Sequence, residues 1–331
     1  MTTQRRYVLI SPTRDEAAHA AYTLESVVRQ TVRPARWIIV DDGSTDQTPS
    51  LLQHYADRYD FIELHRRADR GTRRVGPGVV DAFNAGLSHV ELTSFDYLGK
   101  LDLDLELPRA YFETLMQRFE ADPSLGTCSG KPYYRVNGRL VSEGCGDEMS
   151  VGMTKFYRVA CFQAIGGFAP QVMWDGLDCH MCRMTGWRAQ SFDDTPALRF
   201  VHRRPMGSSD KNVLRGRQRH GYGQYIMGTA PSYMLASVIN RLRFRPRVIG
   251  ALAMGWGYLR PWLRREPSRP PAHVQRFIRQ YQRCCLLLGK ARATARFEQH
   301  GIFRGKGDSH AAGRSSPAGA GRRVDRAATV K

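Results

Sequence analysis

The sequence lacks the features that mark several large classes of protein. No uninterrupted apolar run approaches 18 residues, so no ordinary membrane-spanning helix is expected. The apolar stretch before Pro12 is too short for the core of a signal peptide. Seven cysteines in 331 residues are few and odd in number, which disfavours a disulfide scaffold and favours a reducing compartment. Collagen-like, coiled-coil, mostly disordered and multi-pass membrane proteins are therefore excluded.

Acidic residues are scarce in the second part of the chain. Residues 1–210 contain 25 Lys and Arg and 27 Asp and Glu, a net charge of −2. Residues 211–303 contain 18 and 2, a net charge of +16, and residues 304–331 contain 7 and 2, a net charge of +5. The excess positive charge behind the overall +19 therefore lies in residues 211–331 and suggests that this part contacts an anionic partner. Phosphates, anionic lipid and nucleic acid are the candidates.

The first half alternates short apolar runs with segments of helical spacing. Strands are expected at residues 7–10, 37–40, 61–64 and 97–101, and helices at residues 15–30, 48–59, 78–90 and 108–121. This alternation predicts a mostly parallel sheet flanked by helices, in which ligands bind at the carboxyl ends of the strands.

The second half contains shorter pieces and then arginine-rich helices. Strand-like pieces lie at residues 126–134 and 198–202, and a helix is expected at residues 178–186. We divide the chain into an α/β domain at residues 1–211, a basic helical segment at residues 212–303 and a disordered basic tail at residues 304–331.

Two acidic clusters stand at expected strand ends. Asp102 and Asp104 follow the strand at 97–101, where the turning chain lets both carboxylates converge. Their hard oxygen atoms suit Mg²⁺ or Mn²⁺, which could hold a nucleotide diphosphate, and a solvated acidic turn is the alternative. Asp42 follows the strand at 37–40 and either accepts hydrogen bonds from a base or ribose or belongs to an ordinary turn.

Three other motifs leave alternatives open. His202 ends an apolar strand and is either a structural histidine or a metal ligand. Arg217 is the middle one of three arginines at every second position, which either contact phosphate or form a solvated basic face. Cys179 and Cys182 have no second cysteine pair at zinc-ligand spacing, so we expect them to be packing residues.

Two apolar runs, residues 225–239 and 248–259, interrupt the basic segment and are each followed by arginine-rich sequence. Both are too short to span a bilayer unaided. Trp256, Tyr258 and Trp262 lie beside arginines, a pattern typical of interfacial helices on an anionic membrane. The alternative is that these helices pack on the α/β domain or on another subunit.

Five motifs occur in order along residues 6–205. They are residues 10–16, 38–46 and 101–104 at expected strand ends, then Ile-Gly-Gly-Phe at 165–168 and Trp-Asp at 174–175 ahead of Gly-Trp at 186–187. This succession resembles the family 2 glycosyltransferases. The resemblance implies a GT-A fold and an inverting transfer from a nucleotide sugar.

The resemblance also implies roles on the donor side of the site. Pro12 and Glu16 match the first nucleotide-contacting segment, although Asp15 stands where the family usually has Asn. Asp42 matches the carboxylate that reads the base, which is often uracil. Arg74 matches a further nucleotide-contacting region.

On the metal and acceptor sides, Asp102 and Asp104 match the Asp-X-Asp motif, with Asp104 as the metal ligand. A late histidine completes the metal site in many GT-A enzymes, and His202 matches it. Asp175 matches the catalytic base by its distance from Gly-Trp at 186–187, although Trp174 replaces the expected Glu. Asp178 is the rival base. The arginines around Arg217 follow the base but do not form the family's Gln-X-X-Arg-Trp motif.

The sequence thus predicts a GT-A-like inverting glycosyltransferase with a basic helical extension. The expected donor is a nucleotide diphosphate sugar, above all a UDP-sugar, the cofactor Mn²⁺ or Mg²⁺, and the acceptor a glycan or lipid-linked hydroxyl in polysaccharide or glycolipid assembly. An anionic membrane surface is an expected partner and nucleic acid is not. We expect the protein in the cytoplasm, peripheral at the inner face of the membrane.

Two other functions remain open at this point. A sugar-nucleotide nucleotidylyltransferase shares a similar sheet, but needs a glycine-rich loop after the first strand, and residues 11–16 contain no glycine. A non-catalytic protein that binds anionic lipid or nucleic acid on a degenerate transferase fold would explain the basic segment, but no recognisable nucleic-acid motif accompanies the charge.

Overall fold

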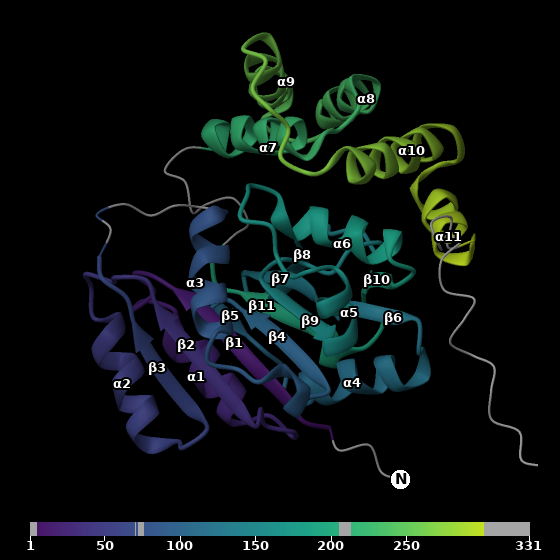
Figure 1. Ribbon diagram of the computed structural model, residues 1–331. Coiled ribbons are helices and arrows are strands. Elements are labelled where there is room, and N and C mark those ends of the chain that lie inside the picture. The colour runs from purple at the N-terminus through teal and green to yellow at the C-terminus, as the bar shows by residue number, and fades with distance from the viewer. Residues whose placement is uncertain (1–4, 70, 72–75, 205–212, 301–331) are drawn as a thin grey trace, which may run out of the picture.

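The computed structural model describes residues 5–69, 71, 76–204 and 213–300. A seven-stranded sheet in the order β10-β6-β9-β4-β1-β2-β3 forms its centre (Figure 1). A four-stranded sheet in the order β5-β11-β7-β8 lies beside it. The strands are β1 (Tyr7–Thr13), β2 (Arg36–Asp41), β3 (Ile62–Arg66), β4 (Tyr97–Leu101), β5 (Leu105–Glu106), β6 (Leu125–Ser129), β7 (Lys131–Val136), β8 (Arg139–Ser142), β9 (Thr154–Arg158), β10 (Arg188–Ser191) and β11 (Arg199–His202).

In the part of the chain that the structure describes, six α-helices flank the central sheet and five more follow along the sequence. The first six are α1 (Ala20–Val28), α2 (Thr48–Arg58), α3 (Pro77–Leu87), α4 (Tyr111–Ala121), α5 (Val159–Ala164) and α6 (Trp174–Met184). The other five are α7 (Val213–Met227), α8 (Pro231–Arg241), α9 (Arg247–Leu263), α10 (Ala272–Leu288) and α11 (Lys290–His300). Short 3₁₀ turns occupy Leu92–Ser94 and Pro196–Leu198.

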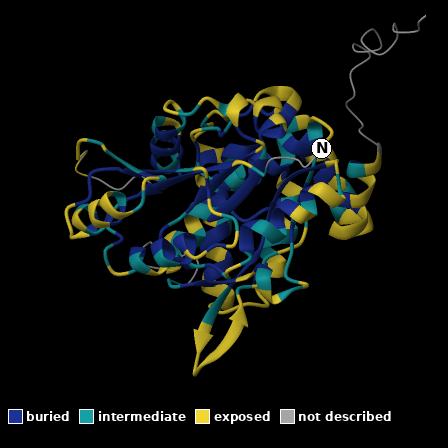
Figure 2. Ribbon diagram, turned by 90° about the horizontal axis from the view of Figure 1, so that it is seen from below, coloured by how far each residue is buried: buried dark blue, intermediate teal, exposed yellow. Residues whose placement is uncertain are grey.

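Successive side chains of the central strands enter opposite layers. On β1, Tyr7 and Leu9 pack with the apolar faces of α1, α2 and α4, whereas Val8 and Ile10 pack with α3, α5 and α6. Strands covered on both faces are continuously apolar, which explains the unbroken runs in the sequence. Figure 2 shows these strands buried beneath helices whose outer faces are exposed. The predicted α/β fold with a mostly parallel sheet is confirmed by the parallel pairing of β1 with β2 and β4, and of β2 with β3.

Several elements differ from the expectation, and two of them bear on the site. No strand was expected at β9, which runs antiparallel between β4 and β6. Its sequence, Thr-Lys-Phe-Tyr-Arg, is half polar and therefore does not look like a buried strand. Lys155 is nevertheless only 1% exposed, because it forms an ion pair that the linear pattern does not reveal. Helix α6 begins at Trp174 rather than at residue 178, so both candidate bases lie on it.

The C-terminal helices form a layer over one end of the domain (Figure 1). Helix α7 packs along α9, and α10 packs on α6 and α11. The apolar run at 225–239 is divided, because Gly228 has a φ of +87° and separates α7 from α8. No helix among the described residues combines the length and the apolar composition needed to cross a bilayer. The predicted boundary at residue 211 and the predicted tail at 304–331 lie outside the described residues, so the three-part division stays a prediction.

Candidate active site

A cavity of about 530 Å³ opens at the carboxyl ends of β1, β2 and β4. This is where parallel strands release loops and where such sheets bind ligands. Seven of the side chains singled out in the sequence line it: Pro12, Glu16, Asp42, Asp102, Asp104, Asp175 and His202. Arg74 lies outside the described residues, and Asp178 and Arg217 do not line the cavity.

The loop after β1 brings Glu16 to the cavity. Asp15 has a φ of +53°, and the Glu16 amide donates to Thr48 Oγ1 at 2.8 Å, so the loop is fixed against the start of α2. The Glu16 carboxylate is buried and accepts a hydrogen bond from Arg204 Nη2 at 2.6 Å. The Glu16–Arg204 ion pair therefore lines the cavity next to the carboxyl end of β1.

The turn after β2 presents Asp42. Asp41 accepts a hydrogen bond from the Ser44 amide at 2.9 Å, and Gly43 has a φ of +77°. A Cβ at Gly43 would lie 2.5 Å from the Asp69 Cα, so only glycine fits this turn. Asp42 is 8% exposed and forms an ion pair with Arg67 at 3.0 Å. Asp41 is thus the structural acid of the pair, whereas Asp42 faces the cavity.

The two aspartates of the Asp-X-Asp motif follow β4 and have different surroundings. Burial raises the pKa of Asp102, although an ion pair with Lys100 opposes the rise. Asp104 Oδ2 lies 3.5 Å from His202 Nε2 and 2.9 Å from Arg204 Nη2. Burial by itself would raise the pKa of Asp104, but these two partners outweigh it and lower the pKa to about 2. Asp104 is therefore the firmly ionised member of the pair.

His202 ends β11 of the four-stranded sheet, and its side chain faces Asp104, which follows β4 of the central sheet. Its Nδ1 lies 2.8 Å from Glu143 Oε1 and its Nε2 faces Asp104. Burial alone would lower the pKa of His202, but the two carboxylates outweigh it and raise the pKa to about 9. The imidazole is consequently oriented by Glu143 toward Asp104.

A divalent ion fits this pair of side chains. Asp104 Oδ1 is buried and has no hydrogen-bond partner among the described residues, so one carboxylate oxygen is left for a ligand. Within those residues no group of three or more His, Cys, Asp or Glu side chains could hold a metal alone. Mg²⁺ in nucleotide sites is typically held by one or two carboxylates together with substrate phosphates. Asp104, together with His202 once the imidazole has lost its proton, therefore matches a site that a bound diphosphate completes.

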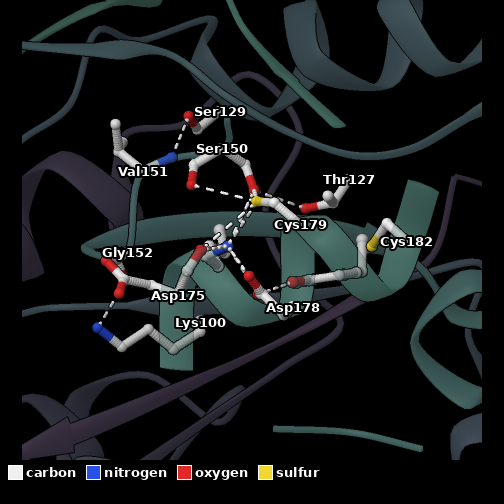
Figure 3. A network of polar contacts seen from close by, with 12 residues as sticks. Lys100, Thr127, Ser129, Ser150, Val151, Gly152, Asp175, Asp178, Cys179 and Cys182 are labelled. Carbon is white, nitrogen blue, oxygen red and sulfur yellow. Dashed lines mark hydrogen bonds and ion pairs between the residues drawn. The ribbon is translucent and has the colours of Figure 1, made fainter. Parts of the chain in front are cut away.

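Asp175 occupies the first turn of α6 and borders the cavity. Among the described residues, its carboxylate forms no ion pair, and the side chain is only partly buried. A Cβ at Gly152 would lie 2.5 Å from Asp175 Oδ2, so the bare backbone of residue 152 leaves room for the carboxylate. Figure 3 shows Asp175 beside Gly152 and Lys100, at the start of the helix.

Asp178 points into the protein instead. It is 1% exposed, lies 2.6 Å from Lys155 Nζ and accepts a hydrogen bond from the Tyr157 hydroxyl. Burial raises the pKa of Asp178, and the neighbouring ammonium opposes that rise. Lys155 also donates to the Asp175 carbonyl at 2.8 Å, so the buried pair fixes the first turn of α6.

Trp174, where the family motif carries Glu, is a packing residue that also borders the cavity. Its ring lies 4.5 Å from the Phe168 ring and 5.4 Å from Lys100 Nζ. Both rings belong to the apolar layer that anchors α6 on the sheet. The tryptophan therefore seats the helix that carries Asp175.

Two cavity arginines were not assigned from the sequence. Arg204 follows β11 and reaches Glu16 and Asp104, whereas the preceding Arg203 turns outward over the Tyr22 ring at 3.7 Å. The alternation of side chains along a strand was the available signal, but it does not say which arginine turns inward. On α7 the cavity is bordered by Arg219 rather than by Arg217.

The paired cysteines on α6 are packing residues, as expected. Cys179 and Cys182 are fully buried, and all seven cysteines are free thiols. Cys179 Sγ lies 3.3 Å from Lys155 Nζ, and Cys182 Sγ lies 3.5 Å from Cys161 Sγ. Burial raises the pKa of the Cys179 thiol to about 12, so it stays protonated.

Comparison with known proteins places this geometry in a family. The family model described as glycosyl transferase family 2 matches residues 8–161. Poly-beta-1,6-N-acetyl-D-glucosamine synthase of Staphylococcus aureus is 29% identical over 121 residues, 37% of this chain and 27% of the synthase. An uncharacterised glycosyltransferase of Escherichia coli is 29% identical over 116 residues, 35% of this chain and 31% of that protein. The matched part spans less than a third of either relative.

Solved structures show the same fold at low identity. The mannosyltransferase PcManGT of Pyrobaculum calidifontis, solved with GDP-Man and Mn²⁺, has a TM-score of 0.51 at 20% identity over 91% of this chain and 86% of its own. GalNAc-T7, solved with UDP, GalNAc and Mn²⁺, has a TM-score of 0.58 at 14% identity over 86% of this chain and 55% of its own. Residues 8–161 therefore match glycosyl transferase family 2, and the chain has the fold of the GT-A glycosyltransferases.

Proposed function

We propose that the protein transfers a sugar from a nucleotide diphosphate sugar to an acceptor hydroxyl, with inversion at the anomeric carbon. The observation that supports this best is the gathering of Asp42, Asp104 and Asp175 around one cavity. These carboxylates come from three separate elements, and each suits a different part of the reaction.

The donor's nucleoside lies along the ends of β1 and β2. The Asp42 carboxylate accepts hydrogen bonds from the base, with Pro12 and Glu16 bordering the same part of the cavity. A UDP-sugar is the first candidate, and GDP-sugars are the second, because both kinds of nucleotide appear in related folds.

The diphosphate lies near Asp104, His202 and the cavity arginines. Arg204 and Arg219 supply positive charge there, and Arg is suited to paired contacts with phosphate oxygens. Asp104 and His202 are the residues that would hold Mn²⁺ or Mg²⁺. When bound, such an ion neutralises negative charge that develops on the departing diphosphate.

Asp175 is the general base. Its carboxylate borders the cavity without an ion pair to the described residues, so it is available to take the proton of the acceptor hydroxyl. Lys155 acts through the backbone, because its hydrogen bond to the Asp175 carbonyl holds the turn in place. Asp178 is a positioning residue in the same network, since its carboxylate is committed to Lys155 and Tyr157.

The acceptor is a glycan or a lipid-linked hydroxyl, in polysaccharide or glycolipid assembly at the inner face of the cytoplasmic membrane. The support for a polysaccharide is the likeness to a synthase that, by its name, builds poly-beta-1,6-N-acetyl-D-glucosamine. The support for a lipid surface is the basic segment at 212–303.

The test separates donor binding from transfer. UDP- and GDP-sugars are screened with Mn²⁺ for a rise in melting temperature and for release of nucleoside diphosphate. Asp175→Asn should lower turnover by about 10²–10⁴-fold with donor affinity nearly unchanged. Asp57→Asn, an exposed carboxylate on α2, is the control and should leave both unchanged.

Two results would contradict the proposal. One is turnover by Asp175→Asn at the parental rate. The other is release of pyrophosphate from a nucleoside triphosphate and a sugar 1-phosphate without sugar transfer, which would identify a nucleotidylyltransferase.

A further inference from the structure

Helices α8 and α9 carry large apolar side chains in solvent. On α9 these side chains include Leu252 at 66% exposure, Ile249 at 60% and Trp256 at 50%. The whole set, named here the α8–α9 apolar face, comprises Leu235, Ile239, Leu242, Phe244, Val248, Ile249, Leu252, Trp256, Leu259, Trp262 and Leu263. On α9 its members recur at intervals of three and four residues, which is one side of a helix.

The opposite side of α9 is also apolar and is already used for packing. A Cβ at Gly257 would lie 2.1 Å from the Gln218 carbonyl oxygen of α7, so the two backbones touch. Met254 and Tyr258 pack with Met234 of α8. A surface helix of a soluble domain has one apolar side, and an exposed second one marks an interaction site.

A basic rim borders the exposed side at the two ends of α9. Residues 231–265 contain seven arginines and no Asp, Glu or Lys. Six of the arginines are exposed: Arg243, Arg245, Arg247, Arg260, Arg264 and Arg265. An apolar strip bordered by arginine and tryptophan matches the boundary between lipid headgroups and acyl chains.

We propose that the α8–α9 apolar face docks on an anionic phospholipid surface, with Leu252 and Trp256 inserted and the arginines at headgroup phosphates. A second copy of the chain fits less well, because a two-fold contact through this face would oppose one arginine rim to another. Residues 304–331 carry a net charge of +5, so they do not complement the rim either.

The structure also selects among the aromatic residues expected at a membrane. Trp256 and Trp262 are 50% and 53% exposed, whereas Tyr258 is 9% exposed and donates a hydrogen bond to the Thr229 carbonyl at 2.7 Å. The expectation that Tyr258 faces the membrane is therefore wrong. Its hydroxyl is used inside the helical layer.

Docking through this face deepens the proposed function, because it names the class of acceptor. Helix α7 packs along α9 and also carries Arg219 to the cavity. In Figure 1, α8 and α9 stand beyond α7, at the end of the molecule away from β1 to β4. A membrane on this face would therefore lie on the side of the cavity bordered by α7, where an acceptor anchored in lipid can enter. This last step rests on the proposed transfer, whereas the docking itself does not.

The first experiment measures co-sedimentation of the full chain with vesicles of phosphatidylcholine alone or mixed with phosphatidylglycerol. Binding should require the anionic lipid and weaken with salt. Leu252→Ser combined with Trp256→Ser should lower the partition coefficient by about ten-fold or more. Leu287→Ser on α10, at a side chain that is 83% exposed, is the matched control and should bind like the parent.

The charge is tested in the same way. Arg264→Gln combined with Arg265→Gln should weaken binding to anionic vesicles, whereas Arg292→Gln on α11 should have a much smaller effect. Melting temperature and nucleotide-sugar binding are measured for every variant. If these stay parental while vesicle binding falls, the loss is one of docking and not of folding or of the proposed function.

The second experiment locates the inserted side chain. Brominated lipid should quench the fluorescence of Trp256 and Trp262, and Trp256→Phe combined with Trp262→Phe should remove most of that quenching. Parental vesicle binding by the Leu252→Ser, Trp256→Ser variant would overturn the proposal. So would a self-association that these substitutions abolish in a protein that does not bind vesicles, because the face would then be an interface between copies.

Discussion

Burial gives different chemistry to two carboxylates that lie three residues apart on α6. Asp175 is partly exposed at the cavity, whereas Asp178 is 1% exposed and ion-paired with Lys155. A base must reach the acceptor's proton, and only Asp175 has that access. Asp178 instead compensates the charge of a lysine that is itself buried at 1% exposure.

Asp178→Asn should therefore destabilise the fold. Removing one partner of a buried ion pair leaves the other charge uncompensated, at a cost of about 3–5 kcal/mol. Chemical denaturation should show this loss in the free energy of unfolding. Asp57→Asn is the control, and Lys155→Met combined with Asp178→Leu should recover much of the stability, because neither charge is then buried alone. An Asp178→Asn protein of parental stability would show that the pair contributes little.

Asp104→Ala should abolish turnover while the fold stays intact. The carboxylate contacts His202 and Arg204 at the cavity edge, and its Oδ1 is available for a ligand. Loss of the parent's activity in EDTA, and its restoration by Mn²⁺ or Mg²⁺, test whether turnover needs a divalent ion. Full activity of the parent in excess EDTA would contradict the metal role of Asp104.

At the scale of elements, α7 and α9 are joined through glycine. A Cβ at Gly257 would lie 2.1 Å from a backbone oxygen of α7, whereas a Cβ at Gly255 would meet nothing nearer than Val238 Cγ2 at 3.6 Å. Position 255 therefore has room for a side chain, whereas position 257 of the same helix has none. The close approach matters for the site because α7 carries Arg219.

Gly257→Ala should destabilise the protein by about 1–3 kcal/mol, since backbone must move to admit the methyl group. Gly255→Ala should be neutral or stabilise by up to about 1 kcal/mol, because alanine favours the helix. Thermal denaturation of the two variants is the measurement. Equal effects of the two substitutions would mean that α9 is not seated on α7 as described.

At the scale of the whole molecule, the C-terminal helices cover part of the surface of the α/β body. Arg183 of α6 is 2% exposed and pairs with Glu298 of α11 at 3.2 Å. Leu177 of α6 packs with Val274 and Ile278 of α10. The predicted domain boundary at 211 would leave this side of α6 uncovered.

A chain that ends at residue 211 should accordingly be less stable than the full chain and should expose apolar surface. Circular dichroism melting and binding of a hydrophobic dye measure the two effects. A chain that ends at residue 300 keeps α10 and α11 and is the matched control, expected to melt like the parent. Equal melting of all three chains would show that residues 1–211 are an independent domain.

Much of the fold and the cavity follows from local sequence. Apolar runs predict β1, β2 and, apart from Lys100, β4, because strands buried on both faces are mostly apolar. The topology of a parallel sheet then brings their carboxyl ends to one edge. This reasoning places Asp42, Asp102 and Asp104 together without coordinates.

Contacts between distant segments decided the rest. Composition and spacing are sufficient to predict the α/β class, the acidic cavity edge and the basic, apolar character of residues 225–265. Three-dimensional contacts are needed to show that Lys155 pairs with Asp178 in the interior, that Arg204 and not Arg203 turns inward, and that Tyr258 faces α7 and α8 while Trp256 faces solvent. Burial and ion pairing depend on partners far away in the chain, and a linear pattern carries no record of which partner a side chain meets.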